Sequence, residues 1–134
     1  MNFLKENMTM NYNETEEFIR DFKKRLKKFP SLTNDLETAK KHVIELFHVR
    51  KIDNRSTFKI KSIGNTEELQ FYKIKKFACK SLKGRGVRSG IRIIYAFFPN
   101  QQKVVFIEIY FKAQQENETR QRMIDFVNAN NYGK

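Results

Sequence analysis

The chain of 134 residues has very little of several residue types, and each shortage argues against a class of protein. Its one cysteine, Cys79, cannot form an intramolecular disulfide and cannot build a cysteine-based zinc site. Its two histidines, His42 and His48, are too few to hold a metal alone, so we expect no metal and no cofactor. The sequence also lacks a long apolar run, so we expect no membrane span and no secretory signal, and we place the protein in the cytoplasm.

Negative charge is missing from the centre of the chain. No Asp or Glu occurs between Leu69 and Ile107, although the whole chain has 15 acidic residues. This stretch supplies nine basic residues, most of the net charge of +12. Such a concentration predicts salt-sensitive attraction to phosphates or to an acidic protein, and RNA is the leading candidate. The basic residues concerned are Lys73, Lys75, Lys76, Lys80, Lys83, Arg85, Arg88, Arg92 and Lys103.

Length and composition indicate one folded unit. A chain of 134 residues with 40% hydrophobic residues suits one domain with one core. We expect residues 14–130 to form this domain. Residues 1–13 are expected to be a partly mobile segment with a candidate edge strand near Thr9 to Tyr12, and residues 131–134 a polar tail.

Helical periodicity marks three segments. From Glu14 onward apolar residues recur at helical spacing, and Pro30 ends the pattern. A second helix follows, with Thr33 or Asn34 as its cap, and the short connection between the two predicts a helical hairpin. The third helix is expected over residues 116–130.

Period-2 alternation marks the strands. Residues 69–80, 91–98 and 103–112 have the alternation typical of strands, and residues 99–102 predict a tight hairpin between the last two. An edge strand is expected over residues 58–63. The sequence therefore predicts an α+β fold, in which the helical hairpin packs on a mainly antiparallel sheet of three to five strands, with a helix at the C-terminal end.

The same alternation predicts which side chains share a face of the sheet. Lys73 and Lys75 should project from one side of their strand, where their ammonium groups repel each other unless an anion lies between them. The alternative is a pair of solvated lysines on an outer face. In the last strand we expect an apolar face with Val105, Ile107, Ile109 and Phe111 opposite a mixed face with Val104, Phe106, Glu108, Tyr110 and Lys112.

A glycine-rich basic segment, residues 81–90, lies between the first two of these strands. Its glycines allow backbone amides to approach an anion closely. The alternative is a connection whose glycines serve only turn geometry. The segment lacks the Gly-Lys-Ser/Thr ending of a phosphate-binding loop that opens a helix, so we do not expect nucleotide hydrolysis.

Three strand segments, with the helical hairpin before them, resemble a known family. They are Tyr72-Lys-Ile-Lys75, Ser89-Gly-Ile-Arg-Ile-Ile-Tyr95 and Phe106-Ile-Glu-Ile-Tyr-Phe-Lys112. Together they resemble the RelE/ParE superfamily of bacterial type II toxin-antitoxin toxins, and the RelE branch most. The resemblance implies a curved antiparallel sheet that cradles RNA, cleavage of messenger RNA on the ribosome without a metal ion, and a cognate antitoxin as partner.

The resemblance also implies roles for individual residues. Lys73 and Lys75 match the paired lysines of the RelE strand, and Arg92 matches the arginine that would clamp the scissile phosphate. The family's second arginine and its C-terminal tyrosine correspond here to Ala113 and Thr119. Candidates to replace them are Lys112, Arg85 and Arg88 for the charge and Tyr95 and Tyr132 for the tyrosine. We expect the surrounding RNA-binding cations to be Lys76, Lys80, Lys83, Arg85, Arg88 and Lys112.

Three functions stay open at this stage. The first is a ribosome-dependent endoribonuclease toxin, in which cations stabilise the extra charge on phosphorus and side chains exchange protons with the 2′- and 5′-oxygens. The second is a ParE-like toxin that binds gyrase and cleaves no RNA. The third is an RNA- or partner-binding module without catalysis.

Overall fold

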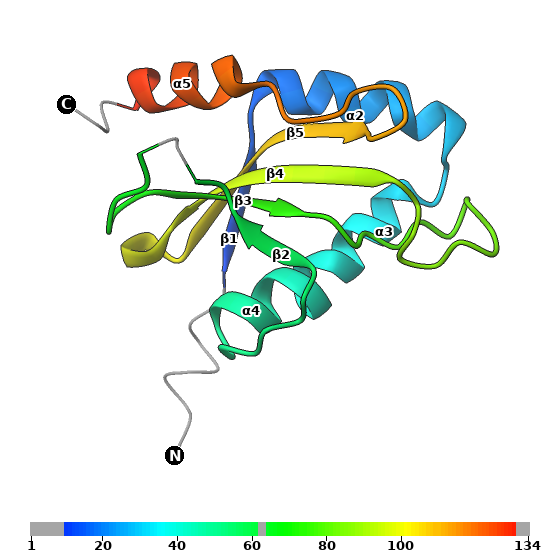
Figure 1. Ribbon diagram of the computed structural model, residues 1–134, viewed down its shortest axis with the longest axis horizontal. Helices are drawn as coiled ribbons and strands as arrows, with labels where there is room; N and C mark the ends of the chain where they lie inside the picture. Colours follow the sequence, from blue (N-terminus) through cyan, green and yellow to red (C-terminus); the bar gives the residue numbers. More distant parts are fainter. Residues whose placement is uncertain (1–9, 62–63, 131–134) are drawn as a thin grey trace.

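The structure is a computed structural model that describes residues 10–61 and 64–130 (Figure 1). Residues 1–9 of the segment predicted over residues 1–13, and the tail predicted at residues 131–134, lie outside the described residues. The elements are β1 (Asn11–Glu14), α2 (Glu16–Lys28), α3 (Leu32–Ala39), a π-helical segment η1 (Lys40–Glu45), α4 (Leu46–His48), β2 (Thr57–Lys59), β3 (Gln70–Ile74), β4 (Ile91–Phe98), a 3₁₀ turn η2 (Pro99–Gln101), β5 (Lys103–Phe111) and α5 (Arg120–Ala129).

The five strands form one mixed sheet in the order β1-β5-β4-β3-β2. Strand β1 runs parallel to β5, and the other neighbours are antiparallel. The predicted α+β class and the mainly antiparallel sheet are therefore confirmed. Across the sheet Lys73 lies opposite Ile94, and Arg92 lies opposite Tyr110.

Local chemistry explains where the first two helices begin. The Thr15 hydroxyl caps α2 by accepting a hydrogen bond from the Phe18 N–H at 3.1 Å. The second helix begins two or three residues earlier than predicted, because Ser31 and not Thr33 or Asn34 is the residue before its first turn. The helix then continues through η1 to the end of α4.

Both faces of the sheet are covered by helices. Helices α2, α3 and α4, with η1, pack on one face, which we call the α2–α4 face, and α5 packs on the other, the α5 face (Figure 1). Sheet residues on the α2–α4 face include Tyr72, Ile93, Tyr95, Phe97 and Phe106. Those on the α5 face include Phe71, Ile94, Ala96, Val105 and Tyr110.

The expected faces of β5 were wrong because of a β-bulge. Ile94 pairs with Glu108 while Tyr95 pairs with Phe106, so Ile107 is an extra residue in β5. An extra residue reverses the alternation of all side chains beyond it. Val104, Phe106 and Ile109 consequently pack on the α2–α4 face, and Val105, Ile107 and Tyr110 on the α5 face.

Strand β3 ends at Ile74, although the alternating pattern predicted a strand to Lys80. The chain leaves the sheet here because it is drawn toward α3. The buried Asp35 carboxylate accepts a hydrogen bond from the Lys80 N–H at 3.1 Å, and the Ser81 N–H donates to the Ser31 hydroxyl at 2.8 Å. Residues 75–90 therefore form a long connection between β3 and β4.

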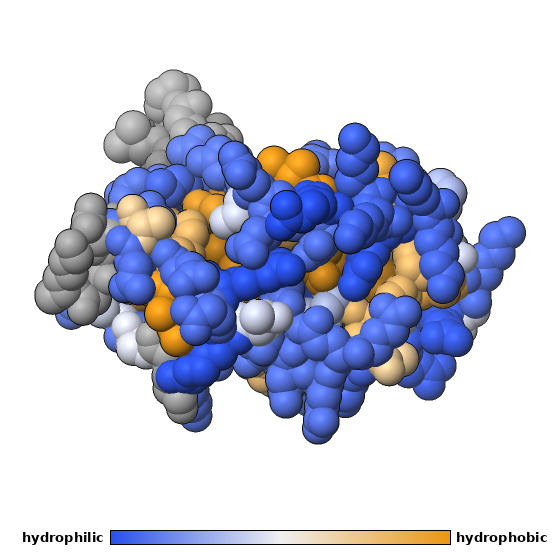
Figure 2. All heavy atoms as spheres, turned by 90° about the horizontal axis from the view of Figure 1, so that it is seen from above, coloured by the Kyte–Doolittle hydropathy of each residue, from blue (hydrophilic) through white to orange (hydrophobic). Residues whose placement is uncertain are grey.

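The outer surface of α2 and α5 is solvated. Figure 2, seen from above these helices, shows mostly hydrophilic side chains, with hydrophobic ones visible in small areas between them. Within the part of the chain that the structure describes, no helix is long and apolar enough to cross a membrane.

Candidate nucleic-acid interface

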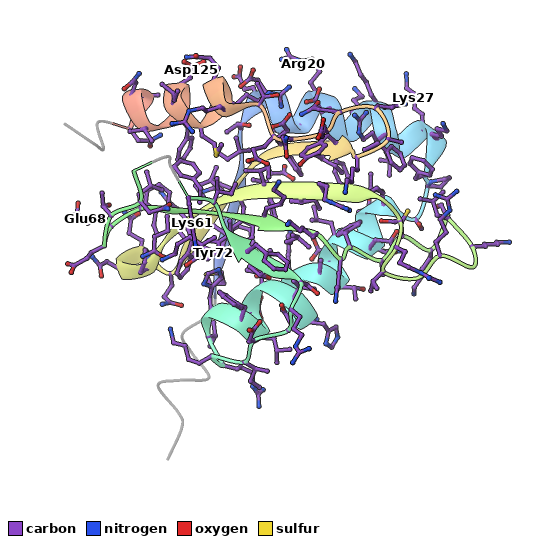
Figure 3. The ribbon with its side chains drawn as sticks, in the orientation of Figure 1. Arg20, Lys27, Lys61, Glu68, Tyr72 and Asp125 are labelled. Atoms are coloured by element: carbon purple, nitrogen blue, oxygen red, sulfur yellow. The ribbon has the colours of Figure 1, made fainter. Side chains whose placement is uncertain are left out.

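The three basic residues expected at the centre of the site come together on the α5 face. Lys73 projects there from β3 and Arg92 from β4, since their cross-strand partners Ile94 and Tyr110 belong to that side. Lys73 and Lys75 line one cavity of about 220 Å³ at the β2 edge of the sheet. The residues that line this cavity, which we call the β2-edge cavity, are Phe58, Lys59, Ile60, Lys61 (labelled in Figure 3), Lys73, Lys75 and Glu118.

Lys73 has a carboxylate as its partner. Its Nζ lies 2.5 Å from Oε1 of Glu118, and the two side chains are only 13% and 18% exposed. The expectation that Lys73 and Lys75 present two uncompensated charges is therefore corrected. The compensating charge comes from residues 112–119, which carry the chain back across the α5 face between β5 and α5.

The ion pair sets the protonation of its neighbours. Burial alone would raise the pKa of Glu118, but the hydrogen bond and charge of Lys73, with the charge of Lys75, lower it below the usual value. Burial raises the pKa of the Tyr110 hydroxyl, and the charges of Glu118 and Glu108 raise it further, against the opposing charge of Arg92. At neutral pH the Glu118 carboxylate is therefore ionised, and the buried Tyr110 phenol near it is neutral.

Lys75 and Arg92 are held differently from Lys73. Lys75 is exposed, and its Nζ lies 4.6 Å from the centre of the Phe58 ring, a cation–π contact. Arg92 is half-buried and donates from Nη1 to the Lys75 carbonyl at 2.9 Å and to the Ile91 carbonyl at 3.5 Å. Both bonds use the same nitrogen, so these contacts leave Nε and Nη2 of Arg92 for an oxyanion.

The other predicted RNA-binding cations are exposed, but most lie away from the β2-edge cavity. The 75–90 connection extends beyond the end of β3, at the right of Figure 1. Gly84 and Gly86 have φ values of +81° and +56°, and a Cβ at either would meet nothing within 4 Å, so the glycines serve the turns of an open loop. Binding of an anion by the backbone amides of residues 81–90 stays a prediction. The exposed cations are Lys76, Lys80, Lys83, Arg85, Arg88 and Lys112.

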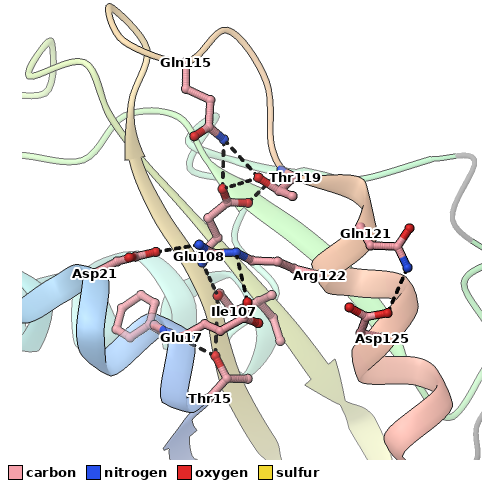
Figure 4. A network of polar contacts seen from close by, with 11 residues as sticks. Thr15, Glu17, Asp21, Ile107, Glu108, Gln115, Thr119, Gln121, Arg122 and Asp125 are labelled. Carbon is pink, nitrogen blue, oxygen red and sulfur yellow. Dashed lines mark hydrogen bonds and ion pairs between the residues drawn. The ribbon is translucent and has the colours of Figure 1, made fainter.

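A buried glutamate holds the segment that carries Glu118. Glu108, 2% exposed, accepts hydrogen bonds from the Thr119 N–H at 2.7 Å, the Thr119 hydroxyl at 2.8 Å and Nε2 of Gln115 at 2.8 Å (Figure 4). Thr119 is the residue before the first turn of α5. Glu108 thereby fixes the start of α5 and, through the adjacent residue, the position of Glu118.

Sequence reasoning could have found Glu108 but not Glu118. A carboxylate inside the apolar run of β5 must be matched by donors when it is buried. Glu118 lies among polar residues between two elements, and nothing in that pattern relates it to Lys73, which is far away in the sequence. Thr119, at the position where the sequence resemblance implied a tyrosine, supports Glu108 instead.

A second ion pair ties α5 to α2. Arg122 places Nη2 at 2.8 Å from Oδ2 of Asp21 and Nε at 3.7 Å from Oε2 of Glu17 (Figure 4). Its Nη1 donates to the Ile107 carbonyl at 3.5 Å, at the bulged residue of β5. The helix that covers the α5 face is thus fastened at its beginning to both the sheet and α2.

The α2–α4 face also has a buried polar pair, His48 and Tyr95, but its members are uncharged. His48, 6% exposed, has Nε2 at 2.7 Å from the Tyr95 hydroxyl, and its ring stacks on Phe97 with centroids 3.9 Å apart. Burial, helped by the charges of Lys51 and Lys59, lowers the pKa of His48 to about 3. Tyr95 points to the face opposite Lys73 and Arg92, so it cannot supply the tyrosine that the sequence resemblance implied. Tyr132 lies outside the described residues.

No metal centre is apparent in residues 10–61 and 64–130, where no group of three or more His, Cys, Asp or Glu side chains could hold an ion. Cys79 is buried near Ser31, and burial raises the pKa of its thiol. Five phenylalanines from the sheet and its connections are buried, namely Phe71, Phe77, Phe97, Phe98 and Phe106.

The chain shows a similarity to a known protein in structure rather than in sequence. No family model matches the chain, and no curated protein matches it. Among solved structures it is similar to a chain of the archaeal RelE-RelB complex from Pyrococcus horikoshii OT3, with 10% sequence identity and a TM-score of 0.48. The match covers 79% of this chain and 98% of that chain.

Proposed function

We propose that this protein is a toxin of a type II toxin-antitoxin system that binds messenger RNA on the ribosome and cleaves it without a metal ion. One observation carries the proposal. Arg92 donates to the backbone carbonyl of Lys75 while the Lys75 ammonium stays exposed, so the α5 face presents two cations beside the Lys73–Glu118 ion pair. Such a pair of cations suits a phosphate that gains negative charge during reaction.

The proposed roles follow from how each cation is held. Arg92 clamps the scissile phosphate through the donors that its carbonyl contacts leave over, ideally with two parallel bonds. Lys75 lies beside it, free to stabilise the pentacoordinate phosphorus and to exchange protons with the RNA oxygens. Lys73 remains a predicted site residue, but its ammonium is already engaged with Glu118, so it lies in the wall of the site.

The test is the substitution Arg92→Ala in a translating extract, with messenger RNA ends mapped by primer extension. We expect cleavage to fall about 100-fold or more, the usual loss when a group that stabilises transition-state charge is removed. Arg50→Ala is the control, because Arg50 is an exposed arginine that follows α4 on the other side of the sheet. Equal cleavage by both variants and the wild type would remove Arg92 from the mechanism.

A second candidate is an RNA-binding module without catalysis, and the Lys73–Glu118 pair favours it. A neutralised lysine, with Ala113 and Thr119 where the family has an arginine and a tyrosine, leaves fewer groups for chemistry. This candidate predicts no cleavage by the wild type and RNA binding that weakens steeply with salt. Plasmid linearised in the presence of purified gyrase, with messenger RNA intact, would instead support a ParE-like toxin.

We further propose a cognate antitoxin as the protein partner. A segment with acidic or apolar residues would cover the basic side of the sheet and so block access to Lys75 and Arg92. Co-expression of the chain with its genomic neighbour should relieve growth arrest and yield a stable complex on size exclusion. Growth arrest that no neighbouring gene relieves would contradict this partner.

A further inference from the structure

The β2-edge cavity contains an ion pair at a place where RNA binding would need a free cation. The Lys73 ammonium lies 2.5 Å from Oε1 of Glu118, and the two side chains are 13% and 18% exposed. Both residues line the cavity together with Lys75, whose side chain is exposed. An ionised carboxylate resembles one phosphodiester group of RNA, because each shares one negative charge between two equivalent oxygens. Glu118 therefore occupies the position at which a phosphate of RNA would meet Lys73.

The two carboxylates next to α5 are held to different degrees. Glu108 accepts three hydrogen bonds, two from Thr119 and one from Gln115. Oε1 of Glu118 is buried too, but within the described residues the Lys73 ammonium is its only close partner. A buried carboxylate needs several donors to offset the loss of its hydration. Glu118 is therefore easier to displace than Glu108.

The carboxylate of Glu118 can leave the cavity without disturbing α5. The anchor of this segment is the next residue, since the Thr119 N–H and hydroxyl both bind Glu108. Glu118 itself lies in the irregular segment between β5 and α5, after the exposed residues Glu116 and Asn117. Rotation about the side-chain bonds of Glu118 therefore moves its carboxylate toward solvent while Thr119 stays in place.

The charges of the cavity remain balanced when a phosphate replaces this carboxylate. Lys73 keeps one anionic partner, so no buried charge is left uncompensated. Lys75 and Arg92 are available to the same RNA strand, because Arg92 donates to the Lys75 carbonyl and the Lys75 side chain is exposed. Without RNA, Glu118 has the opposite effect: it repels an approaching phosphate and keeps Lys73 from it.

We propose that Glu118 makes an autoinhibitory contact, in which its carboxylate occupies a phosphate subsite at Lys73 until a backbone phosphate of bound RNA displaces it. The inference rests on the proposed RNA-binding function and names how that same site is regulated. An RNA strand held by Lys75 and Arg92 brings its next phosphate to Lys73 at a high effective concentration, whereas free phosphate has no such advantage. The contact therefore favours an RNA strand over isolated phosphate groups.

The test measures binding of the full chain to a 5′-fluorescein oligo-uridine 11-mer, made non-cleavable with 2′-O-methyl groups, by fluorescence anisotropy at several salt concentrations. Glu118→Gln should bind about 10-fold more tightly than the wild type. This gain exceeds the roughly five-fold that an exposed ion pair is worth at most. The slope of log Kd against log salt should be the same for both proteins, because Lys73 meets a phosphate in both complexes.

Matched variants separate the contact from the overall charge. Glu116→Gln removes the same charge from an exposed residue of the same segment and should stay within about two-fold of the wild type. Glu118→Asp keeps the charge but shortens the side chain by one methylene, so it should also bind more tightly than the wild type. Combining Glu118→Gln with Lys73→Gln should abolish the gain. Combining it with Lys41→Gln, at an exposed lysine of η1, should retain the gain.

The other outcomes overturn the proposal. No gain in Glu118→Gln beyond that of Glu116→Gln, or no gain in Glu118→Asp, would show that the contact does not compete with RNA, while the RNA-binding function stands. A gain in Glu118→Gln with a salt slope steeper by about 0.7, the value of one added phosphate contact on a single strand, would mean that Glu118 stays on Lys73 in the wild-type complex. No binding of the RNA by the wild type or by either Glu118 variant would reject the RNA-binding function itself.

Discussion

The two faces of the sheet differ in the charge of their buried polar pairs, although β3 and β4 contribute to both faces. On the α2–α4 face, His48 and Tyr95 are neutral, hydrogen-bonded to each other and surrounded by aromatic rings. On the α5 face, Lys73 and Glu118 are charged and paired. The first face keeps its polar pair uncharged and almost fully buried, although His48 borders a cavity, whereas the second keeps charge at the border of a cavity, where a ligand can reach it.

The origin of the partners accounts for this difference. His48 comes from the helix that packs directly on the sheet, so its contacts form together with the core. Glu118 comes from the irregular segment that follows β5, the last strand in the sequence. Glu108 holds this segment in place through Thr119. A site that depends on such a segment can change its charge pattern without changing the core beneath it.

The largest expected difference between the two faces is their response to acid, because the α2–α4 face should lose stability as the pH falls. The pKa of His48 is about 3 in the folded protein and about 6.5 in the unfolded chain, so between these values the unfolded state binds more protons. The stability due to neutral His48 is therefore complete above pH 6.5 and is lost as the pH falls toward 3. The total loss is on the order of 4 kcal/mol, of which about 2 kcal/mol falls between pH 6.5 and 5.

Urea unfolding at pH 7, 6 and 5 measures this effect before most carboxylates titrate. The double variant His48→Phe with Tyr95→Phe replaces both partners by apolar rings and should have a much flatter dependence on pH. His42→Gln removes the other, exposed histidine and should behave as the wild type does. Parallel curves for the double variant and the wild type would mean that the α2–α4 face is not acid-sensitive.

Removing the anchor of the α5 face should have the next largest effect. Glu108→Gln keeps the shape of the side chain but sets an amide N–H₂ against donors from Gln115 and Thr119. We expect a loss of about 3 kcal/mol, as for a buried charged acceptor with several bonds, and a Tm lower by roughly 10 °C. Calorimetry checks this, with Glu116→Gln as an exposed control expected within about 0.5 kcal/mol of the wild type. A Tm within 2 °C or so of the wild type would show that Glu108 does not hold α5.

The smallest effect is expected at the junction of α5 with α2. Asp21→Asn removes the charge that faces Arg122 at 2.8 Å, but both side chains are 20% exposed, and Glu17 remains nearby. We expect a loss of about 0.5 to 1 kcal/mol that shrinks at high salt. Denaturant unfolding at low and high salt measures it, with Asp125→Asn on the outer side of α5 as control. A loss above about 2 kcal/mol, unchanged by salt, would place this pair in the same class as the Glu108 anchor.

Periodic patterns predicted the elements well and their details less well. The bounds of β4 agree with the alternation over residues 91–98, and β5 ends one residue before the predicted Lys112. The predicted faces of β5 failed at Ile107, because a bulge leaves no mark in a run of apolar residues. The predicted length of β3 failed because Asp35 and Ser31, from a distant helix, bind the backbone of Lys80 and Ser81.

The candidate site was predicted in part. Lys73 and Arg92 lie on neighbouring strands, Lys75 follows the first of these strands directly, and Arg92 donates to its carbonyl. Spacing predicted the shared side of Lys73 and Lys75, whereas Arg92 was predicted from the resemblance. Glu118 was missed, and with it the conversion of a purely basic site into one with a buried ion pair. Hydrophobic alternation reports which way a side chain points, but it carries no information about which loop residue arrives beside it.

The sequence by itself determined the class of fold, the excess of positive charge and its concentration between Leu69 and Ile107, because periodicity and composition are local properties of a chain. Only the tertiary structure decided that one of these cations is neutralised, that Arg92 is directed toward Lys75, and that His48 is kept uncharged. Each of these depends on groups distant in sequence meeting at low dielectric, where a single partner decides whether a charge is exposed, paired or absent.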